Sequence, residues 1–135
     1  MKIGILGAGI TGIQTAKNLS KEGYEIFLSE KRKENELDRD TLKKIKKLGI
    51  NTQFGRNSIK FFEECDEVVI SPGIPPKTPI VKKLRGAGKK ILSDLDIAHR
   101  FLSSCVWIGI TGTNGKSTTT KLLGEILSSK YRTFV

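Results

Sequence analysis

The stretch Lys-Ile-Gly-Ile-Leu-Gly-Ala-Gly-Ile-Thr-Gly at residues 2–12 decides the fold of this chain. The run Met1–Leu6 is typical of a buried β-strand, and the glycines after it have the spacing G-x-G-x-x-G. Helical spacing follows, because Ile13, Ala16 and Leu19 recur every three residues. Strand, glycine turn and helix predict a βα unit whose turn offers backbone N–H groups and a positive helix end to a pyrophosphate.

Strands and helices continue to alternate after this unit. A second strand at Glu25–Ser29 ends in Glu30, an acidic residue 18 positions after Gly12. Further strands are predicted at Ile50–Phe54, Glu67–Ser71 and Lys90–Leu92, and helices at Asp40–Leu48, Ser58–Glu64 (capped by Asn57), Pro79–Arg85 and from Ser93 to Leu102. This order predicts an α/β fold: a Rossmann-like five-stranded parallel sheet with helices on both faces.

A second glycine-rich stretch, Gly-Ile-Thr-Gly-Thr-Asn-Gly-Lys-Ser-Thr, lies at residues 109–118. The apolar run Cys105–Ile110 predicts a strand before it, and helical spacing predicts a helix after it. This is the arrangement of a phosphate-binding P-loop, although Ile110 stands where the strict G-x-x-x-x-G-K-[ST] pattern has glycine. In such a loop Lys116 would reach the β and γ phosphates, and the hydroxyl of Ser117 or Thr118 would bind Mg²⁺.

The two motifs suggest two domains. We expect residues 1–92 to form the first domain, and residues 93–135 to form a linker helix and the truncated start of a P-loop ATP-binding α/β domain. Arg132–Val135 would begin a further strand there. Because so few strands cannot bury both faces of a parallel sheet, we expect this second domain to be incomplete in the chain.

Composition narrows the possible partners. The formal charge is +10, from 24 Lys and Arg against 14 Asp and Glu, but many cations within Lys31–Lys47 alternate with acidic residues, as on a solvated helix face. No RNA- or DNA-recognition motif accompanies them, so anionic small ligands are expected and nucleic acid is not. No apolar run approaches the roughly 20 residues of a membrane span, and the N-terminus does not have the pattern of a signal peptide. We therefore expect a cytoplasmic protein.

Cys65 and Cys105 lie far apart, with no companion ligands for a zinc site. Reduced, partly buried thiols are the simplest interpretation of both.

The first glycine motif by itself leaves two ligand classes open. Glu30 could accept a hydrogen bond from the ribose of NAD, which would suit a non-catalytic NAD-binding regulatory module. A UDP-sugar satisfies the same pyrophosphate geometry. The second motif distinguishes the two readings, because a redox-sensing module has no use for a Lys-Ser phosphate loop.

Three stretches together resemble the Mur ligase family, the ATP-dependent amide-forming enzymes of peptidoglycan precursor synthesis. They are Gly7–Gly12 with Ala16 and Leu19, the Ser-Pro-Gly-Ile-Pro segment at 71–75, and Gly109–Thr120. The resemblance is strongest to the D-glutamate-adding members, and the L-alanine-adding enzymes are the alternative within the family. It covers essentially all of the chain but only about the first third of such an enzyme.

The resemblance implies a substrate, a cofactor and a set of site residues. The first domain would hold the UDP part of UDP-MurNAc-L-alanine: Ile10 and Thr11 would offer N–H groups to the diphosphate, and Glu30, Lys31 and Arg32 would border the uridine. The full set is Gly7, Gly9, Ile10, Thr11, Gly12, Glu30, Lys31, Arg32, Ser71, Pro72 and Gly73.

The resemblance also implies an ATP site and a reaction. Gly112, Thr113, Asn114, Gly115, Lys116, Ser117 and Thr118 would bind ATP. Lys116 would act as the catalytic residue that stabilises charge on the transferring phosphoryl group, while Ser117 and Thr118 would hold Mg²⁺. The alanyl carboxylate of the substrate would attack the γ-phosphoryl group and give an acyl phosphate. The amine of D-glutamate would then displace phosphate. We expect the protein to be monomeric and these 135 residues alone to be inactive.

Overall fold

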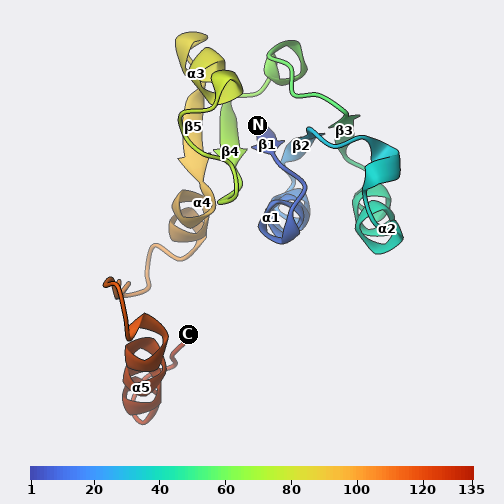
Figure 1. Ribbon diagram of the computed structural model, residues 1–135. Coiled ribbons are helices and arrows are strands. Elements are labelled where there is room, and N and C mark those ends of the chain that lie inside the picture. Colours follow the sequence, from blue (N-terminus) through green and yellow to red (C-terminus); the bar gives the residue numbers. More distant parts are fainter. The chain divides into compact units, whose positions relative to one another are not determined.

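Five parallel strands form the sheet of the computed structural model, which describes residues 1–135 (Figure 1). They are β1 (Lys2–Leu6), β2 (Glu25–Glu30), β3 (Asn51–Phe54), β4 (Glu67–Ile70) and β5 (Lys90–Ser93). Their order is β3-β2-β1-β4-β5, and every neighbouring pair is parallel. The chain thus moves outward from β1 to β3 and then returns to place β4 on the other side of β1. This reversal creates a crevice at the carboxyl ends of β1 and β4, where such sheets bind ligands.

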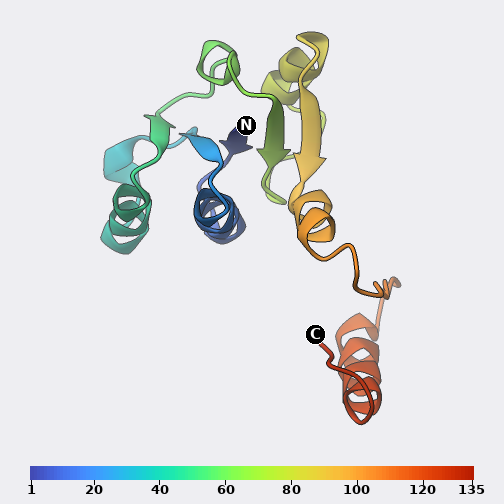
Figure 2. The ribbon, with the colours of Figure 1, turned by 180° about the vertical axis from the view of Figure 1, so that it is seen from behind.

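Helices cover both faces of the sheet, as the views from front and back show (Figures 1 and 2). On one face lie α1 (Ile10–Lys21), α2 (Arg39–Leu48) and α4 (Asp94–Phe101); on the other lie α3 (Pro79–Gly86) and the 3₁₀ turn η2 (Lys60–Phe62). A second 3₁₀ turn, η1 (Glu34–Glu36), precedes α2. The predicted five-stranded parallel sheet with helices on both faces is therefore confirmed.

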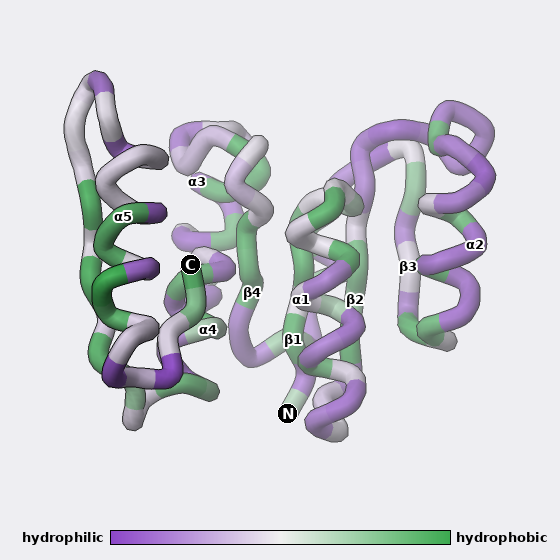
Figure 3. The backbone as a smooth tube through the Cα atoms, turned by 90° about the horizontal axis from the view of Figure 1, so that it is seen from below, coloured by the Kyte–Doolittle hydropathy of each residue, from purple (hydrophilic) through white to green (hydrophobic).

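Two apolar cores follow from this arrangement, one on each face of the sheet. Ile3 and Ile5 belong to the core that contains α1, whereas Leu6 belongs to the core that contains α3. The hydropathy tube shows the contrast between the apolar strands β1 and β4 and the hydrophilic surface of α2 (Figure 3). The fully buried side chains include Ile3, Ile5, Leu19, Ile26 and Leu28 on the first face and Leu6, Phe62, Val68, Val81 and Leu84 on the second.

Local signals fix the helix ends where the sequence places them. Ser93 and Asp96 form the predicted capping box at the start of α4, with Ser93 Oγ accepting from Asp96 N at 3.1 Å and Asp96 Oδ2 accepting from Ser93 N at 2.7 Å. Pro79 is the first residue of α3, where its missing N–H costs nothing.

The predicted helix at 58–64 is wrong. Only the 3₁₀ turn Lys60–Phe62 forms, and Asn57 does not cap it. The side-chain oxygen of Asn57 instead accepts a hydrogen bond from Ser29 Oγ at 2.7 Å, and that tertiary contact holds the preceding loop.

The chain divides by its contacts into a first unit, Met1–Leu102, which contains the sheet, and a second unit, Ser103–Val135. The second unit contains one helix, α5 (Lys116–Ser128). The strands predicted at 105–110 and 132–135 do not form, because a strand needs a hydrogen-bonded neighbour and these segments have none in this chain. No second sheet is present, so the predicted start of a P-loop α/β domain is seen only as a loop and a helix. None of the helices is both long and apolar enough to cross a membrane.

Candidate functional site

A cleft of about 1250 Å³ lies in the first unit, lined by loops that follow β1, β2, β3 and β4. Its volume exceeds the ~300–1,000 Å³ of most small-ligand pockets, so it has room for an extended ligand. All the predicted substrate residues except Gly12 line it: Gly7, Gly9, Ile10, Thr11, Glu30, Lys31, Arg32, Ser71, Pro72 and Gly73. Residues from three predicted segments are thus brought to one place.

The glycine turn supplies the anion-binding element of the cleft. Gly7 has a φ of +99°, which favours glycine, and its N–H donates to Ser29 O at 2.8 Å. Gly9 is the N-cap of α1, and no side chain caps the helix and no acidic residue lies in its first turn. The first-turn N–H groups have no partner within the helix. The start of α1 is therefore suited to bind an anion.

Gly12 lies beneath the turn and has a packing role. A Cβ placed on it would lie 2.1 Å from Gly7 O and 2.7 Å from Ser71 Oγ. Ser71 Oγ in turn donates to Gly7 O at 3.1 Å, and Ser71 N donates to Leu6 O at 3.0 Å. Gly12 and Ser71 together hold the turn against the ends of β1 and β4.

The carboxylate of Glu30 is saturated by internal hydrogen bonds. Oε2 accepts from Ala8 N at 2.9 Å and from Arg32 Nη2 at 3.3 Å, while Oε1 accepts from Arg32 N at 3.0 Å and from Arg32 Nε at 3.2 Å. A carboxylate has about four lone-pair sites, so no acceptor remains for a ribose hydroxyl. This saturation disfavours the NAD interpretation, in which Glu30 holds the ribose.

The same contacts set the charge of Glu30. Burial pushes the pKa of this carboxyl up, but the hydrogen bonds from Arg32 and Ala8 outweigh burial and hold the pKa below its usual value. Glu30 therefore stays ionised and keeps Arg32 in place.

Sequence reasoning missed two parts of the lining. One is the loop Gly55–Ile59 after β3; the other is the rim formed by Ile74, Pro75, Thr78, Pro79, Ile80 and Lys83. The sequence carried a signal for the first of these, the loop after β3. The carboxyl ends of all parallel strands meet at the same edge, and β3 ends beside β2. These additions bring Arg56 and Lys83 to the cleft.

The charge of the cleft favours an anion. Four cationic side chains line it, whereas Glu30 is its one carboxylate. The cations are Lys31, Arg32, Arg56 and Lys83. A groove lined mainly by one sign of charge concentrates ligands of the other sign and speeds their association.

The predicted ATP loop lies in the second unit. Gly112 and Gly115 have φ values of +148° and +76°, and α5 begins at Lys116, directly after Gly115. Lys116 Nζ donates to the carbonyl oxygens of Gly112 and Thr113 within its own loop. No side chain caps α5 and no acidic residue lies in its first turn. Loop and helix start therefore fit a chain of phosphates.

Binding of a metal ion at this loop would depend on the phosphates of a bound nucleotide. Ser117 and Thr118 are exposed at the start of α5, and no group of three or more His, Cys, Asp or Glu that could hold a metal exists in residues 1–135. Mg²⁺ usually takes few protein ligands and completes its shell with phosphate oxygens and water. The two hydroxyls fit that pattern as partial ligands.

Comparison with known proteins gives a consistent result. Residues 1–93 match the family model described as Mur ligase MurD-like, N-terminal domain. The chain is 38% identical to the UDP-N-acetylmuramoylalanine--D-glutamate ligase of Clostridioides difficile, over 97% of this chain and 29% of that protein. It is 40% identical to the enzyme of the same name from Christiangramia forsetii, over 93% of this chain and 27% of that one.

A solved structure shows the same fold. The murein peptide ligase from Psychrobacter arcticus superposes with a TM-score of 0.66 at 22% identity, covering 95% of this chain and 26% of that one. The chain thus spans less than a third of the length of the relatives that it matches.

Proposed function

This chain belongs to the Mur ligase family through its MurD-like N-terminal domain, and on that premise we propose that its cleft binds the UDP part of UDP-MurNAc-L-alanine. The observation that carries the proposal is the meeting of the uncapped start of α1 with four cationic side chains in one cleft. A diphosphate needs both a set of N–H donors and positive charge.

Each part of the ligand has a place in this proposal. The diphosphate lies at the first-turn N–H groups of Ile10 and Thr11, and the uridine lies beside Glu30, Lys31 and Arg32. Ser71, Pro72 and Gly73, which also line the cleft, would border the other side of the ligand. Residues 1–92 constitute the substrate domain, and residues 93–135 constitute the linker helix and the first part of an ATP domain. The linker helix α4 belongs to the first unit by its contacts.

The second unit supplies the ATP loop in this proposal. Gly112, Thr113, Asn114 and Gly115 would cradle the phosphates, and Ser117 and Thr118 would contribute to a Mg²⁺ site. When bound, ATP with Mg²⁺ supplies the phosphoryl group that activates a carboxylate. Lys116 holds positive charge within the loop, and phosphate oxygens would replace the loop carbonyls that it contacts.

The complete enzyme that contains this chain would add D-glutamate to UDP-MurNAc-L-alanine. The alanyl carboxylate oxygen attacks the γ-phosphorus and ADP leaves; the amine of D-glutamate then attacks the acyl carbon, and phosphate leaves. The names of the curated relatives support this choice of amino acid. The chain spans 29% of one of these relatives and 27% of the other, so we expect it to be inactive alone.

Calorimetric titration of the chain tests the proposal. UDP-MurNAc-L-alanine is titrated into one cell, and UDP-MurNAc and NADH are titrated into parallel cells. Saturable binding of UDP-MurNAc-L-alanine, tighter than that of UDP-MurNAc, is the expected result. Tighter binding of UDP-MurNAc would favour an L-alanine-adding ligase, and binding of NADH alone would overturn the proposal.

A further inference from the structure

The side chain of Arg56, unlike that of Arg32, forms no hydrogen bond or ion pair within the protein, although the backbone carbonyl of Arg56 accepts from Ser29 Oγ at 3.2 Å. The guanidinium of Arg32 is held by the carboxylate of Glu30 at 3.2 Å. Arg56 also lines the cleft, but its side chain is exposed and forms no hydrogen bond or ion pair within residues 1–135. A guanidinium carries five N–H donors and no acceptor. Arg56 thus presents a free donor group to any ligand in the cleft.

The backbone that carries Arg56 is held in place by partly buried hydrogen bonds. Ser29, which is fully buried, donates through Oγ to Asn57 Oδ1 at 2.7 Å. Gln53 Oε1 accepts from the N–H and the hydroxyl of Ser58, both at 3.1 Å. A loop that is already ordered loses little entropy when it meets a ligand, so a side chain anchored on it can contribute to specificity.

The position of this loop matches the base end of a nucleotide. The phosphate-binding turn follows β1, and in doubly wound sheets the ribose lies toward the end of β2. The loop after β3 is the next one outward, and Gly55 N donates to Arg32 O at 2.8 Å, which joins it to the β2 loop. A nucleotide that followed this path would place its ribose near the β2 loop and its base toward Arg56.

We propose that Arg56 is a specificity-determining residue that reads the uracil base by donating hydrogen bonds to its carbonyl oxygen. This inference rests on the proposed binding of UDP. Uracil presents an acceptor oxygen at the position where cytosine presents an amino donor, as the corresponding edges of thymine and cytosine do in DNA. A donor-only guanidinium favours the oxygen and faces the amino group unfavourably. Arg56 would thereby select uridine over cytidine nucleotides.

The test measures UDP and CDP affinities by calorimetry on the 135-residue chain and its variants. The wild-type chain is expected to prefer UDP. R56A is expected to lower the affinity for UDP about tenfold, as loss of a charge-assisted hydrogen bond does. It is expected to lower the affinity for CDP less than about threefold. R56K, which keeps the charge but not the planar fork, is expected to retain the attraction to the diphosphate and lose most of the base preference.

R39A is the matched control, because Arg39 is an exposed arginine of α2 that does not line the cleft. It is expected to leave both affinities unchanged. Equal weakening of UDP and CDP in R56A, or a wild-type preference in R56K, would show that only charge matters and would overturn the inference while leaving the UDP site intact. Absence of UDP binding by the wild-type chain would count against the proposed function itself.

Discussion

The carboxylate of Glu30 accepts a hydrogen bond from the backbone N–H of Ala8 at 2.9 Å, which ties the end of β2 to the glycine turn after β1. The same carboxylate also fixes the backbone and the guanidinium of Arg32. A single buried acid therefore organises two walls of the cleft. Its charge stabilises the site before any ligand arrives.

Replacing Glu30 should reveal this role. E30Q removes the charge and half of the acceptor capacity, leaving some of the N–H donors of Ala8 and Arg32 unpaired, and should lower the free energy of unfolding by about 1–3 kcal/mol. Urea denaturation measures the loss. E25Q on the same strand is the control, because Glu25 is exposed and makes only long contacts with Lys2 and Asn51. Equal effects of the two variants would contradict the role assigned to Glu30.

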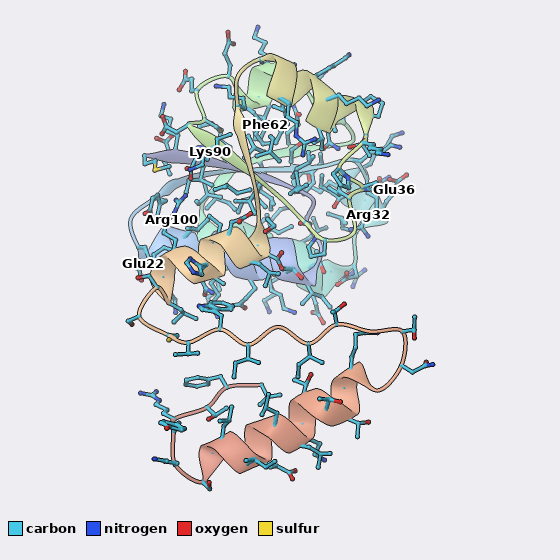
Figure 4. All side chains as sticks on the ribbon, turned by 90° about the vertical axis from the view of Figure 1, so that its left-hand side faces the viewer. Glu22, Arg32, Glu36, Phe62, Lys90 and Arg100 are labelled. Atoms are coloured by element: carbon cyan, nitrogen blue, oxygen red, sulfur yellow. The ribbon has the colours of Figure 1, made fainter.

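Acid should release the ion pairs of Glu67. Its carboxylate bonds Lys90 at 2.9 Å and Arg100 at 2.7 Å, joining β4 to β5 and α4. Figure 4 labels the two cations, Lys90 and Arg100. Burial pushes the pKa of Glu67 up, but the hydrogen bonds and charges of Lys90 and Arg100 outweigh it and hold the pKa below the ordinary 4.5. The stabilisation is thus complete above pH 4.5 and is lost as pH falls through the lower, folded-state value.

Denaturation of the wild-type chain and E67Q from pH 7 down to pH 3 measures this loss. E67Q should be less stable at neutral pH and should lose less stability on acidification. Parallel curves for the two proteins would show that Glu67 does not contribute to the pH dependence.

Gly9, the N-cap of α1, and Gly12, within its first turn, should respond differently to an added methyl group. G12A places a Cβ against Gly7 O and should cost about 1–3 kcal/mol, because the helix or the turn must move. G9A meets nothing within 4 Å and has a φ of −73°, so it should cost less than about 1 kcal/mol as an N-cap change. Thermal unfolding compares the two. A G9A variant as unstable as G12A would refute the packing role of Gly12.

The two thiols should differ in reactivity. Cys65 is buried, and burial raises its pKa to about 11, whereas Cys105 is exposed. Since the thiolate is the reactive form, iodoacetamide at pH 8 should modify Cys105 and leave Cys65 intact in the folded chain. Mass spectrometry of the digested protein identifies the labelled residue, and unfolding in urea should expose both. Rapid labelling of Cys65 under native conditions would contradict its burial.

Lys116 should be needed for turnover in a complete ligase that carries this sequence. K116A removes the positive charge that contacts the carbonyl oxygen of Gly112 in the proposed ATP loop and should reduce kcat at least about 100-fold, as loss of a group that stabilises developing charge does. K121A, one turn further along α5, is exposed and should leave kcat within about twofold. Phosphate release reports both rates. Undiminished turnover in K116A would remove Lys116 from the catalytic role.

Patterns within short segments of the sequence predicted much of the fold and of the candidate site. The alternation of strands and helices, the capping box at Ser93 and the glycine spacing of residues 7–12 depend on contacts between near neighbours, so they can be read directly from the sequence. The parallel sheet followed from the same alternation. Most of the proposed substrate residues lie in the cleft because strands of a parallel sheet end at one edge.

Tertiary structure decided what depends on distant partners. Ala8 and Glu30 are 22 residues apart and Gly7 and Ser71 are 64 apart, so neither the saturation of the carboxylate nor the support of the turn is visible in a local pattern. The rule that parallel strands end at one edge brings the β3 loop to the end of the sheet that holds the cleft, but only the tertiary structure showed that Arg56 on this loop lines the cleft. Dependence on distant partners also explains why the apolar run at 105–110 is not a strand: its composition favours one, but a β-ladder exists only when a neighbouring strand supplies the hydrogen bonds.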